Sequence, residues 1–129
     1  MKAVTDCDKL EKLTVSRNQF GDINDDFRIG CSQYSLKIIN IDESRLNDQG
    51  LKALTKCIKL EKLNASCNEF EKIDEEFKFG NLKDSLKELR VGYSRLSYGG
   101  LQAILNCRKL KIVNVHGNGF DNIERKIFH

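Results

Sequence analysis

Cysteines, histidines and clustered carboxylates are the side chains of this protein most able to do chemistry. The five cysteines are Cys7, Cys31, Cys57, Cys67 and Cys107, and their spacing matches no zinc-ligand pattern. An odd number of cysteines also fits a secreted disulfide framework poorly, which favours free thiols in a reducing compartment. The cysteines therefore predict neither a metal site nor a disulfide scaffold.

The histidines and the acidic run give no catalytic pattern either. His116 has no second histidine or patterned carboxylate beside it in the sequence, so a role in binding contacts is the better prediction. The run from Asp22 to Asp26 lacks the glycine and the glutamate that complete a calcium loop, and it predicts a solvated or capping turn. Neither a phosphate-binding glycine loop nor a nucleophile elbow is present. We therefore expect no enzymatic activity, no cofactor and no metal.

Composition narrows the class of partner. The chain of 129 residues has 22 basic and 19 acidic residues and a net charge of +3. Acids and bases interleave, as from Lys9 to Lys12 and from Lys59 to Lys62, so nucleic-acid binding is unlikely. No apolar run approaches the ~18 residues of a membrane helix. Met1 to Asp6 lack the apolar stretch of a secretory signal, which predicts a cytoplasmic location; an extracellular one stays open, because a signal can be removed.

The elements that must position these residues come from an internal duplication. Residues 1–50 and 51–100 are identical at 22 positions without a gap, and a third copy begins at Leu101. A 50-residue period is too long for one leucine-rich unit of about 20–29 residues, so each copy divides into two. The five resulting units begin near residues 10, 36, 60, 86 and 110.

Each unit carries one pattern of apolar and polar positions. In the first it is Leu10, Leu13, Val15, Asn18 and Phe20. The asparagine position is filled again by Asn68 and Asn118, and by Ser44 and Ser94 in the units between them. A short amide with donors and an acceptor can pair the backbone groups where a chain turns inward, so these residues predict a hydrogen-bonded ladder.

This pattern closely resembles the leucine-rich repeat family, whose core reads L-x-x-L-x-L-x-x-N-x-L, and the resemblance covers the whole chain. It implies an α/β fold: a right-handed solenoid with a curved parallel sheet on the concave side and helices and loops on the convex side. A single domain, residues 1–129, would hold five repeats, without terminal caps.

The stretches between the repeat cores are of two kinds. Asn47 or Asp48 can cap a helix whose apolar face holds Leu51, Leu54 and Cys57, as in ribonuclease-inhibitor and cysteine-containing repeats. The other kind resembles typical repeats, with a short helical turn from Ile23 to Phe27 and then a loop from Gly30 to Ser35.

The repeat frame also assigns the cysteines. Cys7, Cys57 and Cys107 share one repeat position, and two repeats would separate neighbours by roughly 10 Å. A disulfide needs Cα atoms within about 7 Å, so these three are predicted to be buried core thiols. Cys67 lies outside this column, on the open face, and is the candidate for an exposed thiol.

Side chains alternate between the faces of a strand, so the open face of the sheet should carry four rows. The first row is Lys12, Ile38, Lys62, Glu88 and Ile112. The second row is Thr14, Asn40, Asn64, Arg90 and Asn114. The third row is Ser16, Asp42, Ser66, Gly92 and His116. The fourth row is Arg17, Glu43, Cys67, Tyr93 and Gly117.

The fourth row differs in every copy, while framework positions such as Leu10, Asn18 and Phe20 stay fixed. This divergence favours a surface that binds a partner, although drift on an unconstrained face would give the same variation. The predicted binding residues are Lys12, Thr14, Arg17, Asn40, Asp42, Glu43, Lys62, Asn64, Cys67, Glu88, Arg90, Tyr93, Asn114 and His116. Tyrosine and arginine are enriched in interface hot spots. The expected function is non-catalytic recognition of another protein on the concave face. The alternative is a scaffold component that associates, also with its own copies, through uncapped ends.

Overall fold

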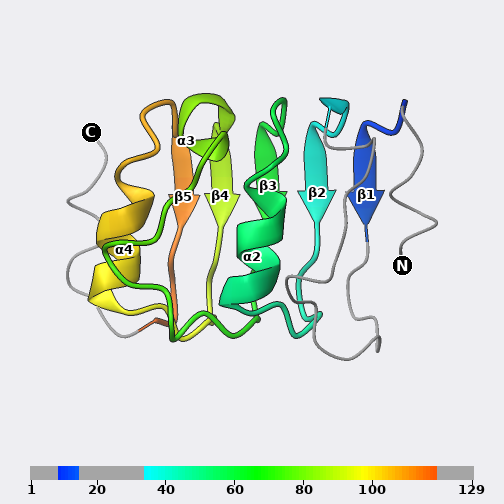
Figure 1. Cartoon of the computed structure of the whole chain (residues 1–129). Coiled ribbons are helices and arrows are strands. Elements are labelled where there is room, and N and C mark those ends of the chain that lie inside the picture. Colours follow the sequence, from blue (N-terminus) through cyan, green and yellow to red (C-terminus); the bar gives the residue numbers. More distant parts are fainter. Residues whose placement is uncertain (1–8, 15–33, 119–129) are drawn as a thin grey trace.

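The structure, a computed structural model, describes residues 9–14 and 34–118. Its five strands form one parallel sheet in the order β1-β2-β3-β4-β5 (Figure 1). They are β1 (Lys12–Thr14), β2 (Ile38–Asn40), β3 (Lys62–Asn64), β4 (Glu88–Arg90) and β5 (Ile112–Asn114). Each strand begins two residues after the leucine that opens its sequence unit. Because consecutive strands are neighbours, the sheet follows the order of the sequence.

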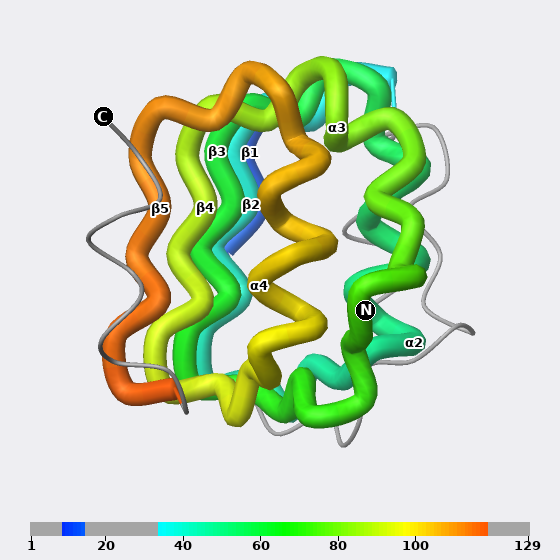
Figure 2. The backbone as a smooth tube through the Cα atoms, turned by 90° about the vertical axis from the view of Figure 1, so that its left-hand side faces the viewer, coloured from blue at the N-terminus to red at the C-terminus, as the bar shows by residue number. Residues whose placement is uncertain are grey.

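Helices cover one face of this sheet. Figures 1 and 2 show α2 (Asp48–Leu54) and α4 (Tyr98–Ile104) lying over the strands, with the short α3 (Leu82–Ser85) near the beginning of the strands. No helix among the described residues lies on the other face, which we call the open face. The chain is therefore an α/β structure with two unlike surfaces.

The two longer helices begin where the sequence provides a cap. The Asn47 side chain accepts a hydrogen bond from Gly50 N at 3.1 Å, and Ser97 Oγ accepts one from Gly100 N at 3.1 Å. Each satisfies a backbone donor that has no partner within the helix. The prediction that Asn47 or Asp48 begins a helix is confirmed, with Asn47 as the cap.

The core lies between the helices and the sheet. Leu13, Ile39, Leu63 and Leu89 are the middle residues of their strands, and all are buried. The apolar face of α2, with Leu51 and Leu54, is buried against them, together with Cys57. Burial of alternate strand residues and of one helix stripe agrees with the periodicities of the sequence.

Buried asparagines join the turns of successive strands. Asn68 Oδ1 accepts from Ser44 N at 3.0 Å and from Leu46 N at 2.9 Å, while its Nδ2 donates to Ile41 O at 3.0 Å and Ala65 O at 2.9 Å. Asn118 makes the same set of bonds one unit of 50 residues later, to residues 91–96 and 115. The predicted ladder is confirmed for these two asparagines, and Asn18 lies outside the described residues.

Left-handed backbone shapes the turns that the ladder holds. Glu43 and Arg45 have φ of 53° and 60°, and they flank Ser44. This alternation lets the N–H groups of Ser44 and Leu46 converge on one oxygen of Asn68. The same arrangement recurs at Tyr93 and Arg95, with φ of 52° and 55°.

One segment has a helix where the matching sequence predicts a loop. The loop expected from Gly30 to Ser35 corresponds to residues 80–85, and α3 occupies positions 82–85 there. The segment that corresponds to Ile23–Phe27 forms turns rather than a helix. The predictions for residues 22–33 themselves, and for Cys7, Ser16, Arg17 and Cys31, lie outside the described residues.

Candidate functional site

The register of the strands sets the first row of the open face. Lys12 pairs with Ile38, Ile38 with Lys62, Lys62 with Glu88, and Glu88 with Ile112. The alignment predicted for this row is therefore confirmed. Ile112 is 43% exposed, and the Lys62 Nζ and a Glu88 carboxylate oxygen are 4.0 Å apart. The row combines apolar and charged side chains.

The second row is also in register, through Thr14, Asn40, Asn64, Arg90 and Asn114. Its asparagines have a local role that the pattern did not predict. Asn64 Oδ1 accepts from Ser66 N at 3.2 Å, and Asn114 Oδ1 accepts from His116 N at 3.1 Å. These side chains support the turn that follows their own strand. In this row Arg90 has the long, half-buried side chain best able to reach a partner.

The third row continues the sheet beyond the strands. Glu43 N donates to Ser66 O at 3.0 Å, Cys67 N donates to Gly92 O at 2.8 Å, and Tyr93 N donates to His116 O at 2.8 Å. One oxygen of this row stands out. Asp42 Oδ1 is buried without a hydrogen-bond partner, the single such side-chain atom found within the described ranges. A buried acceptor of this kind is costly unless a donor reaches it.

The described residues of the fourth row have left-handed backbone and lie at the strand ends. Cys67 and Gly117 have φ of 60° and 74°, and Glu43 and Tyr93 also have positive φ. The Tyr93 ring lies against Gly117, at the place that a Cβ of residue 117 would occupy, and Tyr93 is 68% exposed. Gly117 therefore serves as the support of an exposed aromatic ring as well as a turn residue.

Six of the predicted binding residues meet around one shallow cavity of about 190 Å³ on the open face. They are Lys12, Asn40, Lys62, Asn64, Glu88 and Arg90. Tyr93, Cys67 and Glu43 lie beyond this cavity, at the ends of the strands. The residues predicted to bind thus form two neighbouring zones, a charged one over the strands and a row of turns beside it.

The described cysteines fall into two classes, as predicted. Cys57 and Cys107 are buried, and Cys67 is exposed. Burial raises the pKa of Cys57 from 9.0 to about 12; burial, with a smaller contribution from Asp84, raises that of Cys107 to about 12 as well. Desolvation disfavours the charged thiolate, so both buried thiols are poor nucleophiles at neutral pH.

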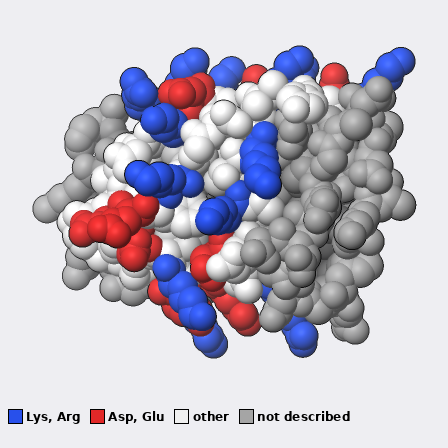
Figure 3. All heavy atoms as spheres, viewed as in Figure 1, with Lys and Arg blue, Asp and Glu red and all other residues white. Residues whose placement is uncertain are grey.

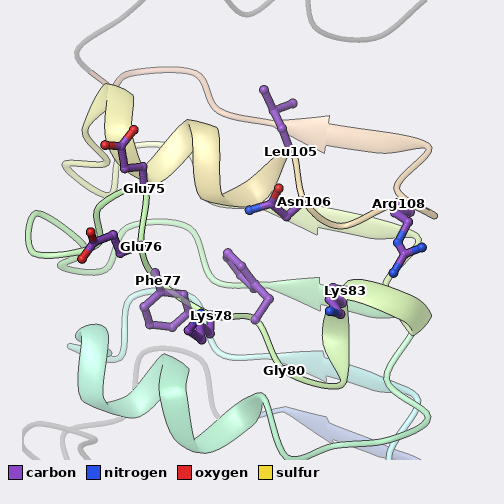
Figure 4. A pocket seen from close by; sticks show the side chains of 10 residues that line it. Glu75, Glu76, Phe77, Lys78, Gly80, Lys83, Leu105, Asn106 and Arg108 are labelled. Carbon is purple, nitrogen blue, oxygen red and sulfur yellow. The ribbon is translucent and has the colours of Figure 1, made fainter.

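A larger cleft lies on the helical face, and sequence reasoning did not predict it. Its volume is about 810 Å³, and it runs between residues 75–83 and residues 105–108, which follow α4 (Figure 4). Figure 3 shows the helical face, where acidic side chains gather at the left and basic side chains lie above them and to their right. Leu105 is exposed and stands where the preceding copy has Thr55, and this difference between the copies is a sequence signal that could have pointed to the cleft.

No group of three or more histidine, cysteine, aspartate or glutamate side chains within residues 9–14 and 34–118 is arranged to hold a metal ion. Within the same ranges, no helix has the length and apolar character to cross a membrane. Comparison of the chain with protein families, with curated proteins and with solved structures finds no match.

Proposed function

We propose that the chain is a leucine-rich repeat module that binds another protein through the open face of its sheet, without catalysis. In this proposal the sheet is the concave side of a short right-handed solenoid, and the helices and turns form its convex side. The observation that carries the proposal is the contrast between the two faces of each strand. Framework residues such as Asn68 and Asn118 repeat at the 50-residue interval, whereas the fourth row of the open face differs in every copy: Arg17, Cys67 and Gly117 occupy one position, and Glu43 and Tyr93 the other.

The composition of the open face supports binding to a protein. Tyr93 offers a ring that is 68% exposed and held against Gly117, so little side-chain entropy remains to be lost on binding. Arg90 lies on the same unit, in the second row, and can form forked hydrogen bonds to a carboxylate.

The mixture of charges favours a protein surface over a polyanion. Lys12, Lys62 and Arg90 share the face with Glu43 and Glu88. A nucleic acid would repel the carboxylates, whereas a protein surface can present both signs in complementary places.

The test compares two double variants of the full chain. Arg90→Ala/Tyr93→Ala removes both candidate anchors from the open face. Lys52→Ala/Tyr98→Ala removes a cation and a tyrosine of 52% exposure from the helical side, as a matched control. Affinity capture from an extract of the source organism, followed by titration with the purified captured protein, should show at least about a tenfold weaker Kd for the open-face variant only, since hot-spot residues contribute about 2 kcal/mol or more each.

A second measurement locates the partner directly. In a Cys7→Ser/Cys31→Ser variant, a photo-reactive maleimide attached to Cys67 places a crosslinker on the open face, because the two other remaining cysteines, Cys57 and Cys107, are buried and weakly reactive. Crosslinks from Cys67 to the captured protein would support the proposal. Equal capture by both double variants, or crosslinks only from a probe on the helical side, would refute it.

A further inference from the structure

The cleft on the helical face has an apolar middle. Phe77 and Phe79 line it with their ring centroids 5.0 Å apart in an edge-to-face arrangement, and Leu105 on the opposite wall is 47% exposed. Its volume of about 810 Å³ lies within the ~300–1,000 Å³ typical of ligand sites. Leu105 is exposed and Phe77 is half-buried, and together they can bury an apolar side chain of a partner, while the buried Phe79 supports the Phe77 ring.

Charges of opposite sign occupy the two ends of this cleft. Figure 4 shows Glu75 and Glu76 at one end and Lys83 and Arg108 at the other, with Phe77 and Leu105 between them. The exposed Asp84 carboxylate lies 3.6 Å from Arg108, but such a solvent-exposed pair contributes little and leaves the guanidinium available. Lys78 lies beside Phe77 in the same view, so one cation also stands between the two ends. The cleft therefore has a direction: two carboxylates lie at one end and two cations at the other, with Phe77, Lys78 and Leu105 between them.

Backbone contacts hold both ends in place. At the acidic end, Ser97 Oγ donates to Ile73 O at 3.0 Å, and a Cβ at Gly99 would lie only 3.1 Å from Glu75 N. At the basic end, Arg108 N donates to Lys83 O at 3.1 Å, which brings the two cations onto adjoining backbone. A cleft whose walls are fixed in this way loses little entropy on binding.

Comparison with the residues 50 positions earlier shows which part of this cleft recurs in the preceding copy and which part does not. Fifty residues before them, Glu75, Glu76 and Phe77 have the counterparts Asp25, Asp26 and Phe27, of the same chemical type. The basic end and the apolar wall differ: Lys83, Leu105 and Arg108 correspond to Gln33, Thr55 and Ile58. The cleft formed by the second and third copies thus has a positive end and an exposed leucine together, which is the combination that completes a site with two charged ends.

We propose that this cleft binds a short peptide segment of a partner protein, in which a basic side chain, one or more apolar side chains and an acidic side chain follow one another. The basic side chain pairs with Glu75 and Glu76, the apolar side chain packs between Phe77 and Leu105, and the acidic side chain pairs with Lys83 and Arg108. The charges fix the direction of the segment, and the apolar middle supplies the contact area. This site does not include the open face, so the experiments on the two surfaces test two separate proposals.

The experiment uses the full chain and two synthetic peptides of equal composition. In the charge-separated peptide, two lysines precede a leucine-phenylalanine-leucine centre and two glutamates follow it. In the charge-interleaved peptide, one lysine and one glutamate stand on each side of the same centre. Fluorescence anisotropy should show saturable binding of the charge-separated peptide, with at least about fivefold weaker binding of the interleaved one, because exposed ion pairs contribute up to about 1 kcal/mol each.

The chain itself supplies conservative variants. Lys83→Gln, Leu105→Thr and Arg108→Ile each introduce the residue found 50 positions earlier, in the preceding copy. We expect Lys83→Gln/Arg108→Ile to weaken the charge-separated peptide by about tenfold and to bring the two peptides to equal affinity. Leu105→Thr should weaken both peptides alike, since it removes apolar contact and leaves the charges in place. The open-face variant Arg90→Ala/Tyr93→Ala should bind the peptide as well as the unchanged protein does.

Backbone amide shifts on peptide addition should map to residues 75–80, 83 and 105–108. Three results would overturn the proposal: no saturation at about 1 mM peptide, equal affinity of the unchanged protein for both peptides, or shifts confined to the rows of the open face. Equally tight binding of a peptide with glutamates alone would point to a simple anion site and would also overturn it.

Discussion

Replacement of Asn68 by alanine is the sharpest test of what holds these turns together. The Asn68 side chain accepts from Ser44 N and Leu46 N at 3.0 and 2.9 Å, and it donates to Ile41 O, Ala65 O and Ser66 O at 3.0, 2.9 and 3.2 Å. Alanine makes none of these bonds and leaves the surrounding backbone in place.

The expected loss of stability comes mainly from two backbone N–H groups that lose the Asn68 oxygen as their acceptor. Ala65 O still accepts from Ser94 Oγ, and Ser66 O still accepts from Glu43 N, so these carbonyls keep a partner. The N–H groups of Ser44 and Leu46 have lost their acceptor in a buried place. A buried donor without a partner costs about 1–3 kcal/mol, so Asn68→Ala should lower the free energy of unfolding by about 4 kcal/mol.

Urea unfolding followed by circular dichroism measures this loss, with Asn64→Ala as the matched control. Asn64 has the same side chain four residues earlier, at the end of β3, but it accepts a single half-exposed bond, from Ser66 N at 3.2 Å. Its removal should therefore cost no more than about 1 kcal/mol. If the free energies of unfolding of the two variants differ by less than about 1.5 kcal/mol, the reasoning from the lost acceptor of the two N–H groups is wrong.

Asn68→Asp tests the donor role of the Asn68 amide separately from its acceptor role. The carboxylate keeps an acceptor for Ser44 N and Leu46 N, but its second oxygen faces Ile41 O and Ala65 O, where Nδ2 had donated. At neutral pH this variant should be as unstable as Asn68→Ala. Its deficit relative to the unchanged protein should shrink on acidification, because a protonated carboxyl group can donate one bond. A pH-independent deficit would contradict this account.

Further predictions concern the thiols, one turn and one cap. The pKa of Cys57 is about 12 in the folded chain, against 9.0 when unfolded, because burial keeps its thiol neutral. Its contribution to the free energy of unfolding is therefore complete below pH 9 and falls by up to about 1.4 kcal/mol per pH unit above it. Cys57→Ala should reduce the fall in the free energy of unfolding, measured with urea, between pH 9 and pH 12, and an unchanged fall would contradict the raised pKa. At pH 7.5, maleimide should modify exposed Cys67 in the folded protein and Cys57 only after unfolding, as peptide mass spectrometry can verify. Gly117→Ala should cost about 1–2 kcal/mol, because φ is 74° and the new methyl group would displace the Tyr93 ring, which ring-proton NMR shifts would report. Asn47→Ala should cost about 1 kcal/mol in thermal unfolding through loss of its helix cap, and no measurable loss would show that the cap is redundant.

Much of the architecture was predictable because it depends on periodic patterns. The alternation of Leu63 with its polar neighbours gives the buried face of β3, and the recurrence of Asn68 and Asn118 gives the ladder. The helix after Asn47 follows from its cap and from the spacing of Leu51 and Leu54. Each of these signals is carried by residues close in sequence and repeats at a fixed interval.

Other features could not be predicted from such patterns. Glu43, Arg45 and Tyr93 are left-handed without being glycine or asparagine, because the ladder oxygen imposes the turn from 24 residues away. The sequence pattern places Asn64 and Asn114 on the open face, but it does not predict that each accepts a hydrogen bond from the backbone two residues later.

The cleft on the helical face needs two segments that meet only in the folded chain. Its acidic end comes close to α4 because Gly99 stands where the earlier copy has Gln49, and its basic end forms through the contact between Lys83 and Arg108. Comparison of the copies for positions where they differ, rather than agree, is the sequence signal that could have found this site.

The direction of the asparagine bonds bears on how the protein is made. Asn68 supplies the acceptor for Ser44 and Leu46, which lie 24 and 22 residues before it, and Asn118 does the same for Ser94 and Leu96. Because the N-terminal part of a chain leaves the ribosome first, the turn after β2 lacks this acceptor until Asn68 has emerged. In the same way, the turn after β4 lacks its acceptor until Asn118 has emerged. Each strand is thus completed by a residue synthesised later, and co-translational folding would trail the growing chain by about one repeat.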